Sequence, residues 1–270
     1  NISEQIVYYS KVGIELAVHD ANSYVRCDTI EFYIGTPSPI YSENFNDGIG
    51  QWITSGDWGL TNNPAYGAFA LTDSPFGDYG AEQTTTAVLN EEFDFSFIVN
   101  PYVSFNARWE IEDGFDFVRF EALTPVNGWV SLEGMHTVSG NGVTVQPLGE
   151  PGYDGDQLSW VGEKIFLDQL NGQRPTAFRF IQNSDELYEG DGFTVDNFML
   201  MGYIQGTFGD FFPDGSINIS DILGLADFIL DSDDASNYVS TFCDMNSDGQ
   251  INILDLLILV NLVIGIRFSS

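Results

Sequence analysis

Two twelve-residue segments near the end of the chain read DFFPDGSINISD, residues 210–221, and DMNSDGQINILD, residues 244–255. Both place oxygen-bearing side chains at positions 1, 5, 9 and 12 and a glycine at position 6. With this spacing a loop wraps oxygen ligands around a cation of calcium size. The second segment begins 34 positions after the first, and the apolar residues that follow each loop repeat at the same offset. The chain therefore carries a duplicated unit of loop plus helix.

The loop positions predict which groups hold the cation. Position 7 offers a backbone carbonyl, and the glycine permits the sharp turn. The predicted calcium ligands are Asp210, Asp214, Ser216, Asn218 and Asp221 in the first loop, and Asp244, Asn246, Asp248, Gln250, Asn252 and Asp255 in the second. Phe212 stands at position 3 of the first loop, where it cannot be a ligand, so we expect the first site to be weaker.

These duplicated loops, each followed by an apolar helix, resemble a type I dockerin over about Gly206 to Gly265. Asp at position 12, where a helix-loop-helix calcium site has Glu, and the absence of an entering helix are similar to that family. The resemblance implies calcium-dependent folding and docking onto a cohesin-type partner. Loop positions 10 and 11 face the partner in dockerins, which implies partner contacts at Ile219, Ser220, Ile253 and Leu254.

The second helix of the repeat, residues 253–264, is apolar almost all round. A helix that is apolar on every side must be covered on every side, and a module of about 60 residues covers only part of it. Leu254, Leu257 and Leu262 are spread around this helix, so we expect some of them to meet another molecule. A cohesin-like domain, a neighbouring subunit or a homo-oligomer is the expected form of this association.

Residues 36–203 predict an all-β domain, because short β-branched and aromatic runs alternate with turns rich in Gly, Asn, Asp and Pro. The segments Gly56–Leu60, Arg108–Asp116, Gly128–Leu132 and Asp191–Asn197 are similar, in order, to the MAM-like domains of immune inhibitor A metallopeptidases. That resemblance implies a non-catalytic jelly-roll sandwich. The expected fold class is thus mainly β: a jelly-roll sandwich followed by a small α-helical dockerin-like calcium module at 206–266.

Residues 1–35 predict strands separated by a turn, and they resemble the last strands of an immunoglobulin-like PKD domain. On that basis we expect the chain to be a piece of a longer secreted protein. Cys27 and Cys243 fall in different modules, and either a disulfide between them or two buried thiols is compatible with the sequence.

The chain has 40 acidic and 8 basic residues, a net charge of −32. Such a surface repels nucleic acid and anionic lipid, so we expect neither as a partner. The longest apolar run, residues 251–266, is too short and too polar to span a bilayer. Calcium loops of this kind function outside cells, and we expect an extracellular or cell-surface location.

Catalytic chemistry finds little support in the sequence. Only His19 and His136 exist, far apart, so a zinc site lacks ligands. No nucleophile elbow or phosphate loop occurs. Glu110 and Glu112 alternate onto one strand face, which fits metal ligands or a solvated rim better than the opposed carboxylates of a glycosidase. We expect no enzyme activity.

A second, structural calcium is expected in the sandwich, where the first and last strands of jelly rolls often share an ion. The candidate ligands are Glu43, Asn46, Asp47, Asp73 and Asp196, with turn formation as the alternative role. The five tryptophans offer sugar-stacking surfaces, although core packing is the simpler role. The sequence therefore predicts a secreted, non-catalytic assembly or attachment protein. The alternative is the carbohydrate-binding or targeting region of a larger secreted hydrolase or peptidase, with a glycan as partner.

Overall fold

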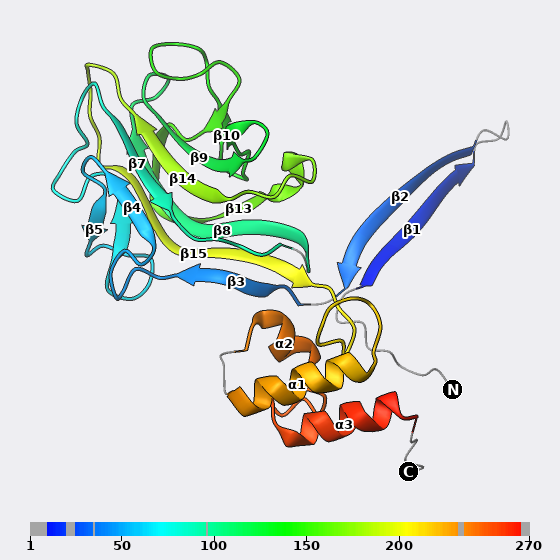
Figure 1. The fold of residues 1–270 in the computed structure, drawn as a ribbon. Coiled ribbons are helices and arrows are strands. Elements are labelled where there is room, and N and C mark those ends of the chain that lie inside the picture. The colour runs from blue at the N-terminus through cyan, green and yellow to red at the C-terminus, as the bar shows by residue number, and fades with distance from the viewer. Residues whose placement is uncertain (1–9, 20–24, 35, 96, 232–234, 266–270) are drawn as a thin grey trace. The chain divides into compact units, whose positions relative to one another are not determined.

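A computed structural model of the protein describes residues 10–19, 25–34, 36–95, 97–231 and 235–265 (Figure 1). The chain forms two compact units. One comprises Asn1–Ser38, Ser96–Val99 and Tyr203–Ser270, and the other comprises Pro39–Phe95 and Asn100–Gly202.

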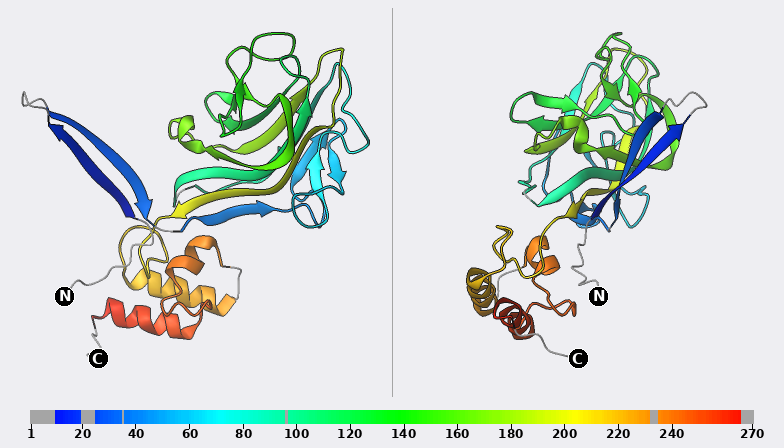
Figure 2. Two further views of the ribbon diagram at one scale, coloured as in Figure 1. Left: turned by 180° about the vertical axis from the view of Figure 1, so that it is seen from behind. Right: turned by 90° about the vertical axis from the view of Figure 1, so that its right-hand side faces the viewer.

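The second unit is a sandwich of two β-sheets, seen from further directions in Figure 2. The five-stranded sheet has the order β10-β9-β14-β7-β4, and the six-stranded sheet has the order β13-β8-β15-β6-β5 with β3 also paired to β15. The strands are β3 (Ser38–Glu43), β4 (Trp52–Ser55), β5 (Gly59–Thr61), β6 (Ala70–Thr72), β7 (Thr84–Leu89), β8 (Ile98–Ile111), β9 (Phe117–Thr124), β10 (Gly128–Ser131), β13 (Gly155–Phe166), β14 (Ala177–Asn183) and β15 (Gly192–Ile204). Neighbours are far apart in sequence: β14 lies between β7 and β9 with Phe180 opposite both Ala87 and Phe120.

Aromatic side chains fill the space between the two sheets. Phe105 of β8 packs edge-on against Phe180 of β14, and Phe198 of β15 contacts both Phe120 of β9 and Trp52 of β4. Period-2 alternation explains this core, because every second residue of a strand faces the opposite sheet. In β7 the alternation is regular, with Thr85, Ala87 and Leu89 buried and the residues between them more exposed. Two short elements complete the unit: the pair β11 (Val138–Ser139) and β12 (Pro151–Gly152), and a 3₁₀ turn at Leu167–Leu170.

The C-terminal part of the chain is helical. It contains α1 (Ile219–Asp231), α2 (Asn237–Phe242) and α3 (Ile253–Val263). Leu225 of α1, Leu259 of α3 and Cys243 form a small core that holds α1 and α3 side by side (Figure 2). The short helix α2 was not expected from the sequence; the hydroxyl of Ser236 caps it by accepting a hydrogen bond from Val239 N at 3.2 Å. The expectation that neither loop has an entering helix is therefore wrong for the second loop.

Residues near the N-terminus form an antiparallel hairpin of β1 (Ser10–His19) and β2 (Val25–Ile34), in register from Ser10↔Ile34 to His19↔Val25. The predicted turn between them lies outside the described residues.

The predicted fold class, a mainly-β jelly-roll-like sandwich followed by a small helical module, is confirmed. Among the described residues, no helix combines the length and the apolar character needed to cross a membrane.

Candidate calcium sites and docking face

The second loop is held in shape by hydrogen bonds from its own backbone to its first and last aspartates. Asp244 accepts Asp248 N at 3.1 Å and Gly249 N at 2.8 Å. Gly249 has a φ of 80°, in the left-handed region that glycine adopts without a steric cost. Asp244 therefore sits at the closed end of the loop, with Asp248 beside it.

Asp255 joins the end of this loop to the start of α3. Its carboxylate accepts Asn246 N at 3.2 Å and Asn252 N at 2.9 Å, while the Asn252 side chain accepts Leu254 N at 2.9 Å. The Asn252 side chain also accepts from the backbone of Asp255, and this reciprocal pairing of Asn252 and Asp255 is a capping box, which satisfies N–H groups that the first turn of a helix leaves unpaired. The residue predicted as the last ligand thus also fixes where α3 begins.

The first loop has the same backbone hydrogen bonds to its first and last aspartates. Asp210 accepts Gly215 N at 2.9 Å, and Asp221 accepts Phe212 N at 3.0 Å and Asn218 N at 2.8 Å. Gly215 has a φ of 82°. The backbone of position 3 therefore makes the same contact in both loops, although its side chain differs.

The first and last aspartates of both loops are buried in a stretch of the chain that has no basic residue. Asp210, Asp221, Asp244 and Asp255 are all buried, the least so Asp244 at 8% exposure. Residues 203–266 contain no Lys, Arg or His, so no side chain of this stretch can neutralise them. Burial raises the pKa of Asp210 above its ordinary value of 3.8. Buried carboxylates without a positive partner are costly, and an all-oxygen donor set is the kind that Ca²⁺ prefers. The predicted ligands therefore fit calcium.

Two residues distinguish the loops. Phe212 brings no oxygen to position 3, and its ring packs against Phe211 and lies over Gly224. At position 4, Ser247 adopts a left-handed φ of 58°, whereas Pro213 is confined to a negative φ. In the second loop Asn246 Oδ1 accepts Asp248 N at 2.9 Å, while in the first Asp214 N bonds to the Phe212 carbonyl. Pro213 is therefore a second reason, besides Phe212, to expect weaker calcium binding at the first loop. This residue was also readable in the sequence.

We predict that Asp248→Ala lowers calcium affinity and the stability of the helical part more than Asp214→Ala does. The second loop keeps its ligand at position 3 and its left-handed residue at position 4, so it should contribute most of the binding free energy. Calcium titration calorimetry on both variants measures this, with exposed Asp57→Ala in the sandwich as the control. Equal losses would contradict the ranking and indicate a compensating ligand in the first loop.

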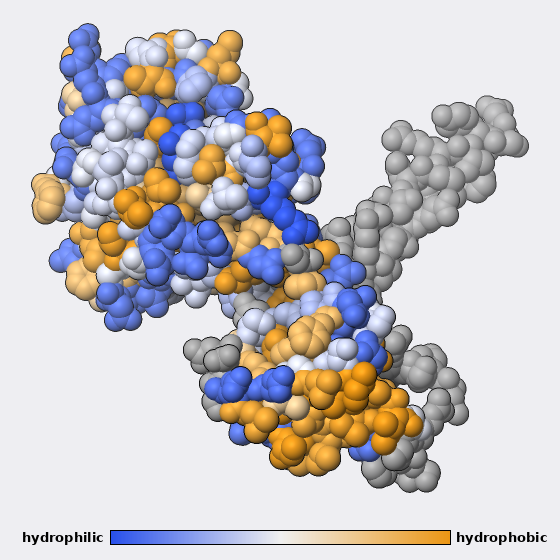
Figure 3. Space-filling view, in the orientation of Figure 1, coloured by the Kyte–Doolittle hydropathy of each residue, from blue (hydrophilic) through white to orange (hydrophobic). Residues whose placement is uncertain are grey.

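The exposed sides of α1 and α3 are formed mostly by apolar residues. We call this surface the docking face; its residues are Ile219, Ser220, Leu223, Asp227 and Leu230 on α1, and Ile253, Leu254, Leu257, Ile258 and Leu262 on α3. Its apolar members are between 38% and 79% exposed, and a broad apolar area is visible over this region in Figure 3. All six residues predicted to contact a partner are exposed.

The arrangement around α3 differs from the expectation in one respect. Leu254, Leu257 and Leu262 are not spread around the helix but share its exposed side, because Asp255, Leu256 and Leu259 occupy the side turned to the core. Leu223, Asp227, Leu230 and Ile258 were missed as members of the face. The 34-residue repeat could have indicated Leu223, since it corresponds to Leu257.

Cys243 lies in the core beside Leu225 and Leu259 and is a free, buried thiol. Burial, followed by the nearby Asp221, raises its pKa to about 12. Of the two alternatives for the cysteines, the buried thiol therefore holds for Cys243. The side chain of Cys27 lies outside the described residues.

The structure brings four of the five predicted sandwich ligands to one region. Asn46 Oδ1 accepts Ala68 N at 2.6 Å, and Asp196 accepts Tyr66 N at 2.9 Å, so both hold the same loop. Glu43 and Asp47 line a neighbouring open cleft of about 530 Å³ together with Asn197. Burial raises the pKa of Asp196.

Asp73 does not join the other four. It is 2% exposed and accepts Phe193 N at 2.9 Å with one oxygen, while the other oxygen has no hydrogen-bond partner. Burial raises its pKa from 3.8 to about 7. Its environment is that of an isolated buried carboxyl.

We predict that Asp73→Asn stabilises the sandwich above pH 7 but not near pH 4. A raised folded-state pKa means that the folded protein holds this proton more tightly than the unfolded chain. The protonated Asp73 carboxyl therefore costs the wild-type sandwich no stability below about pH 4, whereas the wild-type protein loses stability as the pH rises through 7. An asparagine, which does not ionise, avoids this loss. The shift of roughly three pKa units corresponds to about 4 kcal/mol at high pH. Urea unfolding at pH 4.5 and 8.5, followed by tryptophan fluorescence, measures it, with Asp57→Asn as control. Destabilisation of the Asn variant at pH 8.5 in calcium would instead assign Asp73 to a cation site.

A separate carboxylate group lies at the end of β8. Among the described residues, Glu112, Asp116 and Asp185 form the one trio in which one carboxylate oxygen of each residue lies within 4.8 Å of those of the other two. Tyr79 Oη donates to Asp116 at 2.6 Å, and Asp185 N donates to it at 2.7 Å. Burial raises the pKa of both Glu112 and Asp116.

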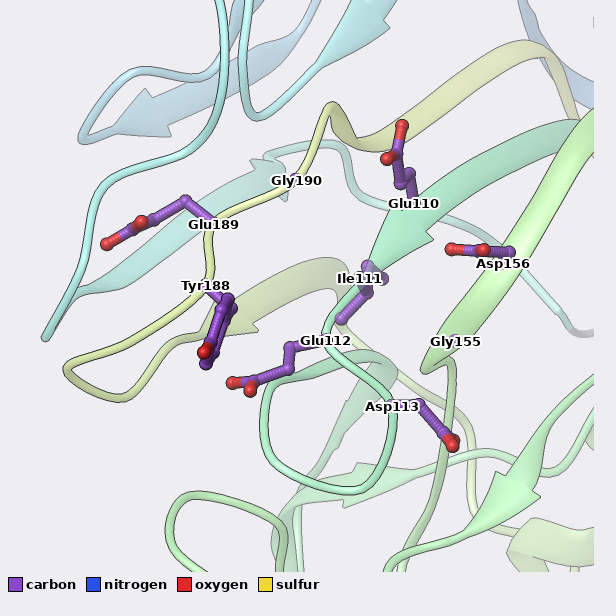
Figure 4. A pocket seen from close by; sticks show the side chains of 9 residues that line it. All are labelled: Glu110, Ile111, Glu112, Asp113, Gly155, Asp156, Tyr188, Glu189 and Gly190. Carbon is purple, nitrogen blue, oxygen red and sulfur yellow. The ribbon is translucent and has the colours of Figure 1, made fainter.

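An open cleft of about 520 Å³ adjoins this trio (Figure 4). Glu110, Glu112 and Asp113 line it from one side, and Tyr188 and Glu189 from another. The trio fits a shared cation or proton better than two carboxylates on opposite sides of a glycosidic bond. Sequence reasoning missed Asp185, which is 69 positions from Asp116.

The tryptophans mostly serve the core. Trp52, Trp58 and Trp109 are buried, as expected for core packing. Trp129 and Trp160 are half-buried, and an arginine covers each ring: Arg179 at 4.2 Å and Arg108 at 5.6 Å from the ring centroid. Little tryptophan surface is therefore free for stacking a sugar.

Comparison with known proteins identifies one region of the chain. No curated protein matches the chain. Similar solved structures include the K3 cleaved adhesin domain of Lys-gingipain from Porphyromonas gingivalis, with 11% identity over 60% of this chain and 98% of that chain and a TM-score of 0.40. A CBM22-1 xylan-binding domain from Paenibacillus barcinonensis has 13% identity over 63% and 97%, with a TM-score of 0.37. Residues 208–264 match the family described as Dockerin type I domain. The dockerin resemblance is thereby confirmed for this region, whereas the MAM-like and PKD-like assignments stay predictions.

Proposed function

We propose that this protein is a secreted, non-catalytic, calcium-dependent assembly or attachment protein, whose dockerin-like module docks onto a cohesin-type domain. Calcium would occupy the two loops, held by the aspartates, asparagines and position-7 carbonyls named above, and would supply the positive charge that these loops lack. The sandwich would be the body that the module attaches to its partner.

The docking face is the observation that carries this proposal. Isolated exposed apolar side chains are normal, but a contiguous apolar area marks an interaction site. The face begins where the calcium loops end, since Ile219 and Ile253 are the first residues of α1 and α3. Ion binding and the shape of the face are therefore coupled through Asp221 and Asp255.

The other side of the module has a different neighbour. Tyr238 and Phe242 of α2 are buried, and Phe97, Ile98 and Phe208 pack against them. Phe97 lies 4.7 Å from Tyr238 between ring centroids, and Gln205 N donates to the Phe97 carbonyl at 2.7 Å. The α2 side is thus already covered within its own unit, which leaves α1 and α3 for a partner.

Isothermal titration against a panel of purified type I cohesin domains tests the proposal. We expect at least one to bind in 1 mM CaCl₂ and to lose binding in EGTA. A glycan array run in parallel examines the alternative, a carbohydrate-binding region of a larger hydrolase. Submillimolar sugar binding without any cohesin binding would overturn the assembly function in favour of that alternative.

A further inference from the structure

The charge distribution around the docking face restricts the kind of surface that fits it. Residues 203–266 contain ten aspartates and no basic residue. Asp210, Asp221, Asp244 and Asp255 are buried in the loops. The exposed aspartates that are not predicted ligands include two on α1 itself, Asp227 and Asp231. Every charged side chain that this helix presents to a partner is therefore negative.

Asp227 lies within the docking face, one turn after Leu223 and just before Leu230, and Asp231 is the last residue of α1. The C-terminal end of a helix carries a partial negative charge, so an aspartate there is unfavourable without a nearby cation. The last turn of α1 contains no basic residue. A lysine or arginine supplied from outside would offset this repulsion.

A second copy of the chain does not meet this requirement. Two copies would bring α1 aspartates towards each other, in a protein whose net charge is −32. Like charges brought together across an interface disfavour the wrong partner. The charge pattern therefore favours a different protein over self-association.

We propose that the partner surface that covers the docking face is apolar at its centre and carries lysine or arginine at its margin, opposite Asp227 and Asp231. This inference rests on the proposed docking function. The leucine and isoleucine side chains of α1 and α3 provide burial, and the margin provides orientation and fast, salt-dependent association.

The test uses the cohesin domain that binds most tightly in the panel above, remade in two forms whose four margin residues opposite α1 are all Lys or all Glu. Association and dissociation rates are measured by surface plasmon resonance in 1 mM CaCl₂ at 50 and 500 mM NaCl. We expect the Lys form to bind at least about tenfold more tightly than the Glu form at 50 mM NaCl, mainly through the association rate, and the difference to shrink at 500 mM.

Charge reversal on this chain provides the matched control. The double variant Asp227→Lys, Asp231→Lys should bind the Glu form of the cohesin more tightly than the Lys form. The double variant Asp57→Lys, Asp168→Lys makes the same charge change at exposed sandwich positions and should still prefer the Lys form. Equal binding of both forms, or tighter binding of the Glu form, overturns the basic margin while the docking function stands. A stable homodimer of the protein alone at 50 mM NaCl also overturns it. Absence of any calcium-dependent cohesin binding removes the docking function, and this inference with it.

Discussion

Removal of calcium with EGTA is expected to unfold the helical module, residues 206–265, while the sandwich stays folded. Four buried aspartates without a basic residue repel one another once the ions leave, and the fully buried core of α1 and α3 contains little more than Leu225, Cys243 and Leu259. A binding site that does not exist in the unfolded chain converts its binding free energy into folding free energy. At calcium a thousandfold above Kd, each site contributes about 4 kcal/mol.

Two optical signals separate the parts of the chain. All five tryptophans lie between residues 52 and 160, so their fluorescence reports the sandwich, whereas far-UV circular dichroism at 222 nm reports α1 and α3. We expect EGTA to abolish the helical signal and leave the fluorescence transition in place. Magnesium at equal ionic strength is the control for screening. A helical transition at the same temperature with and without calcium would show that the loop assignment is wrong.

Leu257→Asp is expected to weaken docking by about 2–4 kcal/mol, roughly 30- to 1000-fold, with little change in folding. Leu257 is 52% exposed in the free protein, so an aspartate there costs the monomer little. In a complex the same carboxylate would be buried against an apolar surface without a partner, which is costly. Leu254→Asp and Leu262→Asp should behave similarly because all three share the exposed side of α3.

The measurement is titration with the cohesin domain in calcium, together with thermal unfolding of each variant. Leu158→Asp is the matched control, because Leu158 is also exposed but lies in the sandwich. Leu259→Asp should instead unfold the module, since Leu259 is fully buried. Normal binding by all three docking-face variants would show that α3 does not meet the partner.

Local spacing explains why the two dockerin-like loops were predictable. Every predicted ligand of one site falls within twelve consecutive residues, and the first and last aspartates of each loop accept backbone N–H groups of the same loop, as Asp244 does from Gly249. The strands of the sandwich were predictable for the same reason, because a short β-branched and aromatic run bounded by turn residues is a property of one stretch of chain. The helix α2 was not predicted, since six residues are too few to show a helical period.

Which side of a helix is exposed, and which residues surround a given carboxylate, depend in contrast on contacts between residues that are distant in the chain. The sequence of an almost uniformly apolar helix such as α3 does not show which of its sides is buried. That side is defined only when Leu225 and Cys243 pack against Leu259. Nor does spacing place Asp185 beside Asp116, or separate Asp73 from the other expected sandwich ligands; β-pairing between strands far apart in the chain does so.

The sequence by itself determined the spacing of the two dockerin-like loops, the difference between them at position 3 and the order of the sandwich and the helical module, because these depend on residues close together in the chain. The tertiary structure decided which side of α3 is exposed, which residues cover α2 and which carboxylates of the sandwich are buried. Those properties arise from burial and long-range packing, which only the folded chain brings about.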